Sequence, residues 1–310
     1  MDLRHLYESI PGVQWLWNAI NIIVGEIMLP FDKLYFAKKE FKKAFGRPMN
    51  VITPKNLVEK FYWLELNTDL SMLTRCADKY AVRDYVKERG CGEILNELYA
   101  KWDNPEDIVF DELPDSFILK TNNGSGDVTI ISDKKKASLE DIKIHFKRLF
   151  KERYGEKNAQ YHYIGIRPCI IAEKLLPLEN ISFSCSIIDY KIWCFNGIPE
   201  CIWVAYNRKK DHVYMDLFDT DWNAIPQKMK SNTHYQYHPE IIIPKPDSLG
   251  EMLKYASILS EGFPEVRVDF YEIGGKVIFG EMTFTSGYGY FTDDFYDYLG
   301  SKTILPIRGN

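Results

Sequence analysis

The segment of residues 266–283, VRVDFYEIGGKVIFGEMT, constrains the fold more than any other because it predicts a β-hairpin. Apolar and polar residues alternate along its first half with the period of two that a half-buried strand requires. Gly274 and Gly275 supply the positive φ angles of a tight turn. In the returning half, the same period predicts one shared face for Val277, Phe279, Glu281 and Thr283.

Two acidic residues interrupt these otherwise apolar strands. Folding the hairpin at its glycines makes Asp269 and Glu281 neighbours, although a slip of one residue would separate their faces. One interpretation is a pair of solvated acids on an edge hairpin. The other is a pair of oxygen ligands for Mg²⁺, which proteins bind through one or two carboxylates together with substrate phosphates. The second interpretation requires a phosphate-binding segment elsewhere in the chain.

Length, charge and cysteine content narrow the class of protein. With 310 residues, 45% of them hydrophobic, the chain can bury a large core in one domain or two. Its 39 basic and 44 acidic residues are interspersed and give a net charge of −5, which argues against a nucleic-acid partner. The six cysteines form no C-x-x-C pair, and the six histidines show no metal-ligand spacing. Scattered free thiols are typical of a reducing compartment, so we expect a cytoplasmic protein.

The apolar N-terminal segment, GVQWLWNAINIIVGEIMLPF at residues 12–31, is interrupted by polar residues. It lacks the basic start and small-residue cleavage site of a signal peptide, and it is too polar for a confident membrane span. An amphipathic helix remains, either packed on the body of the protein or lying at the inner face of the membrane. We favour packing and keep peripheral membrane association as the alternative.

The order of the remaining patterns predicts an α+β fold, with helices first and antiparallel strands later. One helix is expected to begin with Thr53 as its N-cap and Pro54 at its first position. Further on, FNG at residues 195–197 predicts a hairpin between the segments DYKIWC and PECIWVAYN. The chain shows no internal repeat and no low-complexity segment.

The most informative loop lies in FILKTNNGSGDVTII, residues 117–131. A buried strand ends at Lys120, and a flexible turn follows that contains Asn123, Gly124, Ser125 and Gly126. Glycines let backbone N–H groups close on an anion, and a lysine at the strand end neutralises phosphate charge. The loop is not a Walker motif, because no G-K-[ST] follows it. A plain hairpin with one exposed lysine is the alternative.

A second strand end lies in CIIAEKLL, residues 169–176. An apolar strand is followed there by Glu173, Lys174, Leu175 and Leu176. Such a junction can present backbone N–H and C=O groups to the edge of an adenine ring while leucines cover its faces. An ordinary strand end with a charged tip is the alternative.

In this order, the segments resemble the ATP-grasp fold, which has a lysine strand with a glycine loop, an acidic hinge strand and an R-x-D…E-x-N metal hairpin. A closer resemblance is to the TupA-like ATP-grasp proteins, found with bacterial surface-polysaccharide and teichuronopeptide biosynthesis. It rests on TPKNLVEKFYWLEL, ADKYAVRDYV, LPDSFILKTNNGSG, DYKIWCFNG and RVDFYEIGGKVIFGEMTFTSGYG, and it covers about residues 30–300. It implies a helical leader, a helical N-terminal region and two α+β lobes that clasp ATP, at residues 1–50, 51–115, 116–176 and 177–310.

The resemblance implies a set of ATP contacts. Lys120 would contact the α- and β-phosphates while the glycine loop closes over the triphosphate. Arg83, in DKYAVR, would replace the family's second phosphate lysine and keep its charge. Residues 173–176 would hold the adenine, and Glu179 would hold the ribose.

The resemblance also implies the reacting centre. Asp269 and Glu281 would bind Mg²⁺, with Thr283 in place of the family's asparagine as a third ligand. Arg267 would stabilise charge on the transferring γ-phosphoryl group, and Lys191 would face the phosphates or the acyl group.

The implied activity is that of an ADP-forming carboxylate–amine ligase that acts through an acyl phosphate. Its partners would be a small molecule or saccharide that carries a carboxylate, and an amine. The family's setting suggests an amino acid joined to a sugar acid, with Tyr288, Tyr290 and Tyr296 available to stack on the sugar. Two alternatives remain: a glycosyltransferase whose paired acids hold Mn²⁺, and an ATP-grasp kinase, which the Thr283 substitution favours.

Overall fold

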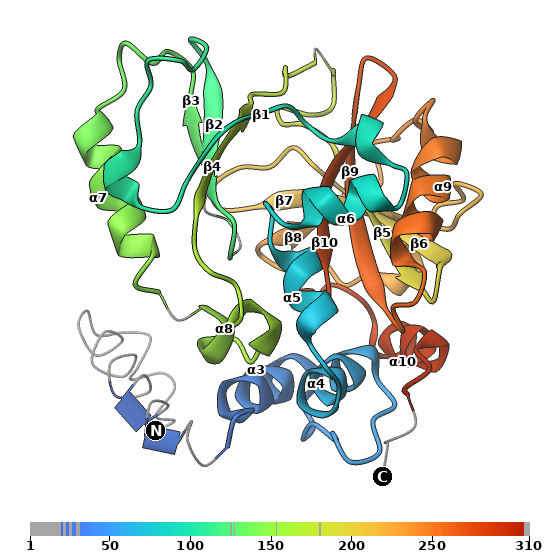
Figure 1. Ribbon diagram of the computed structural model, residues 1–310. Helices are drawn as coiled ribbons and strands as arrows, with labels where there is room; N and C mark the ends of the chain where they lie inside the picture. The colour runs from blue at the N-terminus through green and yellow to red at the C-terminus, as the bar shows by residue number, and fades with distance from the viewer. Residues whose placement is uncertain are drawn as a thin grey trace, which may run out of the picture.

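The structure, a computed structural model, describes residues 20, 23–24, 27–28, 32–124, 126, 128–152, 154–179 and 181–306 (Figure 1). Most of the apolar N-terminal segment lies outside the described residues, so its expected packing stays a prediction. Within the described ranges, no helix is both long and apolar enough to cross a bilayer. The fold is mixed α+β, as predicted, with two sheets and a layer of helices below them in Figure 1.

The smaller sheet has four antiparallel strands in the order β1 (Leu98–Trp102), β4 (Ile170–Lys174), β2 (Phe117–Thr121) and β3 (Val128–Ile131). Helix α7 (Leu139–Leu149) covers one of its faces, where Phe146 packs with Phe117 and Ile170 in one buried cluster. Strand β1 joins this sheet from the region before residue 116 that was expected to be helical. The lobe therefore begins earlier in the chain than the predicted boundary.

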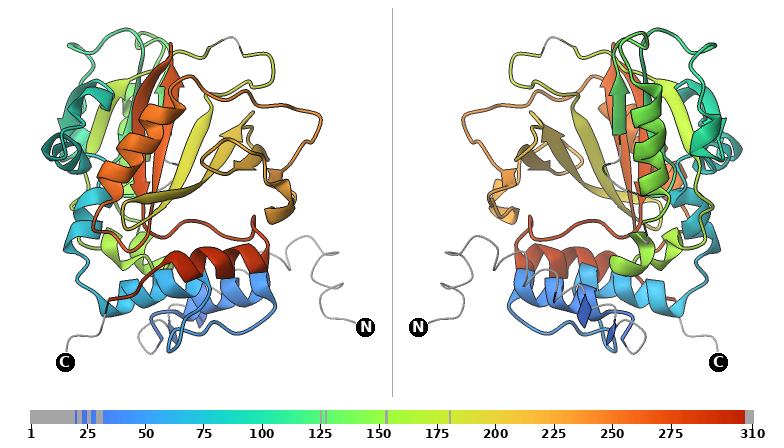
Figure 2. Two further views of the ribbon diagram at one scale, coloured as in Figure 1. Left: turned by 90° about the vertical axis from the view of Figure 1, so that its right-hand side faces the viewer. Right: turned by 90° about the vertical axis from the view of Figure 1, so that its left-hand side faces the viewer.

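The larger sheet has six strands in the order β10 (Lys276–Thr283), β9 (Val266–Ile273), β5 (Asp189–Phe195), β6 (Ile198–Tyr206), β7 (Val213–Phe218) and β8 (Tyr235–Gln236). All neighbouring pairs are antiparallel except β7 and β8. The predicted β5–β6 hairpin is confirmed, with Asn196 and Gly197 at positive φ in its turn. Helix α9 (Leu249–Ser260) covers the face that carries Ile192, Val204 and Val268 (Figure 2).

The opposite face of the larger sheet packs on the helical layer (Figure 2). Trp193 and Trp203 share a buried cluster there with side chains of α3 (Tyr35–Phe45), α4 (Leu57–Asn67) and α10 (Asp293–Lys302). The remaining helices are short: α5 (Ser71–Ala77), α6 (Val82–Glu88), α8 (Tyr154–Lys157) and the 3-10 turns Gly92–Ile94, Pro105–Asp107, Tyr161–Tyr163 and Pro226–Lys228.

Helix α4 begins later than the sequence predicted. Asn56, not Thr53, is its N-cap: the Asn56 side chain accepts a hydrogen bond from the N–H of Val58 at 2.9 Å. Glu59 completes a capping box by accepting from the N–H of Asn56 at 3.2 Å. The predicted start at Thr53 is wrong because this reciprocal pair satisfies more of the free N–H groups than a threonine followed by proline would.

The β9–β10 hairpin is confirmed, with Gly274 at φ 59° and Gly275 at φ 72° in its turn. Asp269 pairs directly with Glu281 across the two strands. The register shifts between Phe279 and Glu281, where Gly280 is the extra residue of a β-bulge.

Because of the bulge, the last residues of β10 point to a different face of the sheet from the one that the sequence predicted. Val277 and Phe279 point into the core below α9, whereas Glu281 and Thr283 point to the opposite side of the sheet. A strict period of two would have kept all four side chains together, so that prediction is wrong. The extra residue reverses the alternation and turns Glu281 toward Asp269.

Helices α4 and α10 touch at Gly300, where any larger residue would collide with the backbone. A Cβ added at Gly300 would lie 2.0 Å from the carbonyl oxygen of Lys55. We expect Gly300→Ala to lower the free energy of unfolding by about 1–3 kcal/mol, as overpacking does. Gly250→Ala is the control, because Gly250 lies in α9 with no described atom within 4 Å of the added Cβ. Denaturant unfolding that ranks the two variants equally would contradict this account of the contact.

Candidate active site

A cavity of about 710 Å³ lies between the two sheets. The smaller sheet contributes Lys120, Gly126 and Val128 to its lining. The larger sheet contributes five charged side chains: Asp189, Lys191, Arg267, Asp269 and Glu281. Its volume falls within the range of about 300–1,000 Å³ that is usual for small-molecule sites. The cavity therefore joins the predicted phosphate-binding strand to the predicted metal hairpin.

On the larger sheet, Arg267 and Asp269 form a buried two-pronged ion pair. Nε and Nη2 of Arg267 donate to the two carboxylate oxygens of Asp269, each at 2.7 Å. Residues two apart on a strand share a face, which is why this pair forms along β9. Nη2 also lies 3.4 Å from Oε1 of Glu281 and 3.1 Å from the hydroxyl of Thr283. That hydroxyl donates to Glu281 at 3.1 Å, so Thr283 bridges the arginine and the acid.

The neighbouring strand β5 adds a second cation to this cluster. Lys191 lies opposite Asp269 in the register, and its ammonium donates to the same carboxylate. It also lies 2.6 Å from Oδ2 of Asp189, which is 8% exposed. Oδ1 of Asp189 is buried and has no hydrogen-bond partner among the described residues.

Asp189 was not predicted as a site residue, although the sequence carries a signal for it. Asp189 and Lys191 are the ends of DYK, and positions two apart in a strand point to one face. The lysine alone was assigned from this motif. Because both side chains line the cavity, the acid belongs to the candidate site as well.

Burial and neighbouring charge set the protonation of this cluster. Burial favours neutral Asp269, but Arg267 and Lys191 outweigh it and hold the pKa of Asp269 below its usual value. Burial raises the pKa of Asp189, because Lys191 compensates only in part and the Asp269 carboxylate adds repulsion. Although burial disfavours its charge, Asp269 raises the pKa of Arg267 above the ordinary value. The acid between the two cations is thus the one that stays ionised.

In the smaller sheet, another buried acid forms ion pairs with two basic side chains. Glu173, 5% exposed, lies 2.7 Å from Nζ of Lys120 and 3.2 Å from Arg83. Arg83 also donates to the carbonyl of Asn96 at 2.6 Å and is not among the residues that line the cavity. The structure therefore brings Lys120 to the cavity and directs Arg83 to the far side of Glu173.

Lys79 is a cation of this cavity that the sequence analysis did not assign to the site. It lines the cavity, and its ammonium donates to the carbonyl of Gly124 in the glycine loop. Its own N–H donates to the carbonyl of Asn122 at 3.0 Å. The signal was present, because Lys79 opens the same DKYAVR motif that supplied Arg83.

Of the other predicted nucleotide contacts, Gly126 lines this cavity, and Lys174, Leu175, Leu176 and Glu179 are not among its lining residues. Glu179 accepts a hydrogen bond at 2.7 Å from the N–H of Gly274, at the hairpin turn. Lys174 is exposed and pairs with Glu97 at 3.5 Å, and Leu175 and Leu176 are half-buried. Within the glycine loop, Asn123 is half-buried, Gly124 is held by Lys79, Gly126 lines the cavity and Ser125 lies outside the described residues.

Aromatic and polar side chains line the end of the cavity near the helical layer. Tyr288 lines it, as predicted for a substrate contact. Tyr290 instead stacks on Trp203, with ring centroids 4.6 Å apart, and Tyr296 is 1% exposed. The expectation that these two rings face a substrate is therefore wrong, because core packing uses their faces. Oε1 of Gln160 has no partner among the described residues and lines the same end.

The oxygen ligands present fit a magnesium ion that also contacts phosphates. Within the described ranges, no three His, Cys, Asp or Glu side chains gather into a metal site of their own. Mg²⁺ does not need one, because it commonly uses one or two carboxylates and completes its shell with phosphate and water. Glu281 is 36% exposed toward the cavity, and the unpartnered Oδ1 of Asp189 supplies a further hard donor.

Comparison with known proteins gives one family match. The family described as TupA-like ATPgrasp matches residues 59–304, which is most of the chain. No curated protein matched.

Three solved structures are similar in fold. L-amino acid ligase from Bacillus licheniformis is 13% identical, with a TM-score of 0.47, over 82% of this chain and 55% of that one. D-alanine–D-alanine ligase from Bacillus anthracis is 17% identical, with a TM-score of 0.42, over 77% and 69%. The same enzyme from Helicobacter pylori is 13% identical, with a TM-score of 0.44, over 83% and 68%. The chain thus spans about half the length of the first of these structures.

The Asp269 cluster predicts a pH-dependent stability. Asp269→Asn leaves two buried cations short of a partner, so we expect a loss of about 3–5 kcal/mol in unfolding free energy at pH 7. The folded pKa of Asp269 lies below the unfolded value of 3.8, so its contribution is complete above that pH and is lost as pH falls through the folded pKa. Denaturant unfolding should show the gap to wild type closing below pH 3.8. Asp221→Asn, at an exposed acid, is the control, and a pH-independent gap would contradict the assignment.

Proposed function

The chain belongs to the TupA-like ATP-grasp family, and from this premise we propose that it is an ATP-dependent ligase that joins a carboxylate to an amine. The membership confirms the resemblance that the sequence showed. The single observation that supports the activity is the cavity of about 710 Å³, which brings Lys120 and the glycine loop together with Arg267, Asp269 and Glu281. A nucleotide bound there would contact both lobes at once.

We assign the triphosphate to the cations that face the cavity. Lys120 and Lys79 lie on the side of the glycine loop, and Lys191 and Arg267 lie on the side of the metal hairpin. Carboxylates orient Lys120 and Lys191, so phosphate oxygens would replace these carboxylates as partners of ammonium groups that are already positioned. Arg83 would act through Glu173, which it shares with Lys120. In this proposal the adenine lies at residues 173–176 and the ribose near Glu179.

We assign Mg²⁺ to Asp269 and Glu281, with Thr283 beside them and Asp189 as an added oxygen donor. When bound, the ion would neutralise charge on the β- and γ-phosphates. Asp269 would keep its ion pair with Arg267, which fixes the carboxylate in place. The hydroxyl of Thr283 would continue to orient Glu281.

The proposed reaction has two steps. A carboxylate oxygen of the substrate attacks the γ-phosphorus of ATP, the bond to the β,γ-bridging oxygen breaks, and ADP leaves. The amine nitrogen then attacks the acyl carbon, loses a proton and expels inorganic phosphate with the carboxylate oxygen. Arg267 and Lys191 would stabilise the negative charge that develops in both steps, so no side-chain nucleophile is needed.

We propose a sugar acid as the carboxylate substrate and an amino acid or related amine as its partner. Tyr235 and Tyr288 line the cavity and are only half-buried, and such rings pack well on sugars. Oε1 of Gln160 would accept from a sugar hydroxyl. We place this reaction in the cytoplasm, with the inner face of the membrane as the alternative, and assign it to surface-polysaccharide synthesis.

Nucleotide choice tests the proposal first. At 100 times its dissociation constant, ATP with Mg²⁺ should raise the free energy of unfolding by about 2.7 kcal/mol. Lys120→Ala should remove most of this stabilisation, because it deletes a phosphate countercharge, whereas Lys136→Ala, at an exposed turn, should keep it. Thermal unfolding is the measurement. Stabilisation by a UDP-sugar with Mn²⁺ and none by ATP would favour a glycosyltransferase and contradict the ligase.

Oxygen transfer tests the chemistry whatever the substrate proves to be. An acyl phosphate hands one carboxylate oxygen of the substrate to the released phosphate. We therefore expect an ¹⁸O-labelled carboxylate substrate, found by screening sugar acids against amino acids, to deliver label to inorganic phosphate. Mass spectrometry of the phosphate and the product measures this. Label that stays wholly in the product would exclude the acyl phosphate, and a phosphorylated product without an amide would indicate the kinase.

A further inference from the structure

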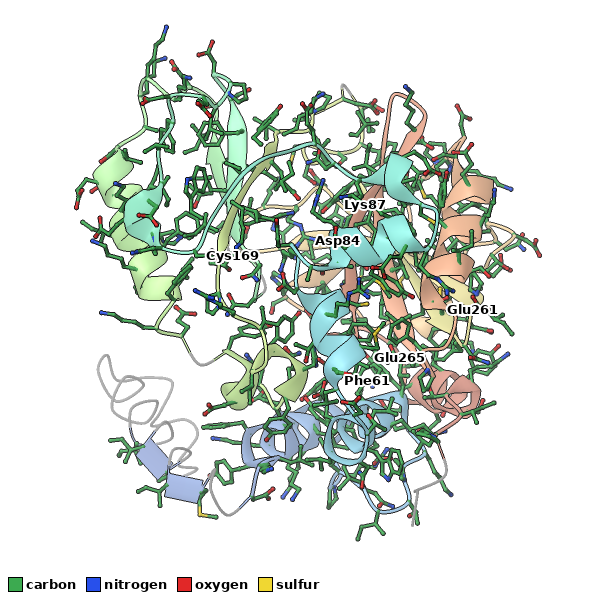
Figure 3. All side chains as sticks on the ribbon, in the orientation of Figure 1. Phe61, Asp84, Lys87, Cys169, Glu261 and Glu265 are labelled. Atoms are coloured by element: carbon green, nitrogen blue, oxygen red, sulfur yellow. The ribbon has the colours of Figure 1, made fainter. Side chains whose placement is uncertain are left out.

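A second cavity, of about 460 Å³, lies where α4 and α5 meet the end of α9. Figure 3 labels Phe61 of α4 and Glu261 and Glu265 of the segment between α9 and β9, all of which line the cavity. It shares no lining residue with the cavity between the sheets. It is therefore a separate site, and the proposed ligase reaction does not use it.

One buried acid in this cavity has no internal partner. Glu265 is 3% exposed, and neither of its carboxylate oxygens has a hydrogen-bond partner among the described residues. A buried polar group without a partner is costly, and native proteins rarely keep one without a reason. Packing does not supply the reason, because an apolar residue of similar size would fill the same space. A ligand that completes the hydrogen bonds of Glu265 would.

The charges around the cavity indicate which kind of hydrogen-bond partner Glu265 lacks. Four acids line it, against the single cation Arg89: Glu65, Asp69, Glu261 and Glu265. Three of the acids are already satisfied: Glu65 by His162, Asp69 by Ser71 and Glu261 by Arg89. Arg89 is engaged as well, because its Nε and Nη2 donate to the carbonyl of Ile258. Glu265 thus lacks a hydrogen-bond donor, and the surrounding negative charge favours a cationic one.

The walls of the cavity define the rest of the ligand. Phe61, Phe263 and Phe284 line it together with Leu64 and Leu73. The rings of Phe263 and Phe284 lie 5.2 Å apart at an interplanar angle of 50°. Apolar walls bind an apolar body, and aromatic faces also attract a cation. The matching ligand has an apolar or aromatic body with a positive charge at one end.

We propose that this cavity binds a small organic cation, a protonated amine on an apolar body, with its ammonium group against Glu265. The proposal is independent of the ligase activity, because it concerns a different set of residues. Glu265 nevertheless lies just before β9, two residues from Arg267, whose charge acts on the Glu265 carboxyl. A cation bound at Glu265 would therefore change the electrostatics beside the reacting centre.

Protonation of Glu265 should follow occupancy. Burial raises the pKa of Glu265 well above its usual value, and Arg267 compensates only in part. The other charged or titratable groups around it are Glu65 from α4, Asp69, Tyr85 from α6, Arg89 and Glu261. An incoming ammonium group would favour the carboxylate, so binding should release a proton and tighten as pH rises, until the amine itself deprotonates.

The test compares two ligands of the same shape. Phenethylamine is positively charged at pH 7, and 2-phenylethanol is its uncharged counterpart. We expect calorimetry to show at least about tenfold tighter binding of phenethylamine to the full chain, since hydrogen bonds to charged groups are the stronger ones. Glu265→Gln should remove this preference, and Glu152→Gln, at an exposed acid of the other lobe, should keep it. Equal binding of both ligands, no binding of either, or an unchanged preference in Glu265→Gln would overturn the proposal.

A stability measurement separates a ligand site from a structural role. Without ligand, Glu265→Met should unfold at a higher temperature than wild type, because it removes an unpartnered buried acid while keeping the volume. The same variant should lose all stabilisation by phenethylamine. A lower unfolding temperature for Glu265→Met would show that the acid supports the fold instead. A shortened chain gives one more test, because Pro306 lines the cavity. If phenethylamine binds only after the residues beyond Pro306 are removed, the cavity belongs to the chain's own C-terminal segment and the proposal is overturned.

Discussion

The buried ion pair between Arg267 and Asp269 is the interaction on which the candidate active site depends. It lies on β9, in the larger sheet, and Lys191 extends it to the neighbouring strand β5. With Asp269 only 1% exposed, each charge is tolerable only because the others are present. The cluster therefore forces β5 and β9 to present the same face to the cavity. The side chains that would meet a phosphate are fixed before any ligand arrives.

The smaller sheet repeats this arrangement with different residues. Glu173 is buried between Lys120 and Arg83, as Asp269 is between Arg267 and Lys191. In both lobes a buried acid orients cations that line the cavity, Lys120 in the smaller and Lys191 and Arg267 in the larger, which would limit the reorganisation that binding of the proposed polyphosphate requires. The two lobes thus prepare opposite sides of one cavity by the same electrostatic means, although they share neither sheet nor core.

Short-range patterns predicted the elements, and tertiary contacts decided how they are used. Alternation identified the hairpin and brought Asp269 close to Glu281, and the order of the motifs identified the family. Two details escaped because distant atoms determine them. Lys79 rather than Arg83 faces the cavity and contacts the glycine loop, and Trp203 takes the face of Tyr290 that was expected to meet a substrate. Neither partner lies near its residue in the sequence. The start of α4 was missed for a local reason, because the capping box of Asn56 and Glu59 lies just beyond the Thr-Pro pair.

The bulge at Gly280 has a consequence for how this hairpin tolerates changes in length. A Cβ at that position would lie 2.9 Å from the carbonyl oxygen of Asp269, so an insertion there is restricted to glycine unless the strands move apart. A deletion of the same residue would restore strict alternation and still leave Glu281 opposite Asp269. Related chains can therefore differ by one residue at this point and keep the acid pair. A sequence alignment that allows no gap at Gly280 would therefore misalign either Asp269 or Glu281.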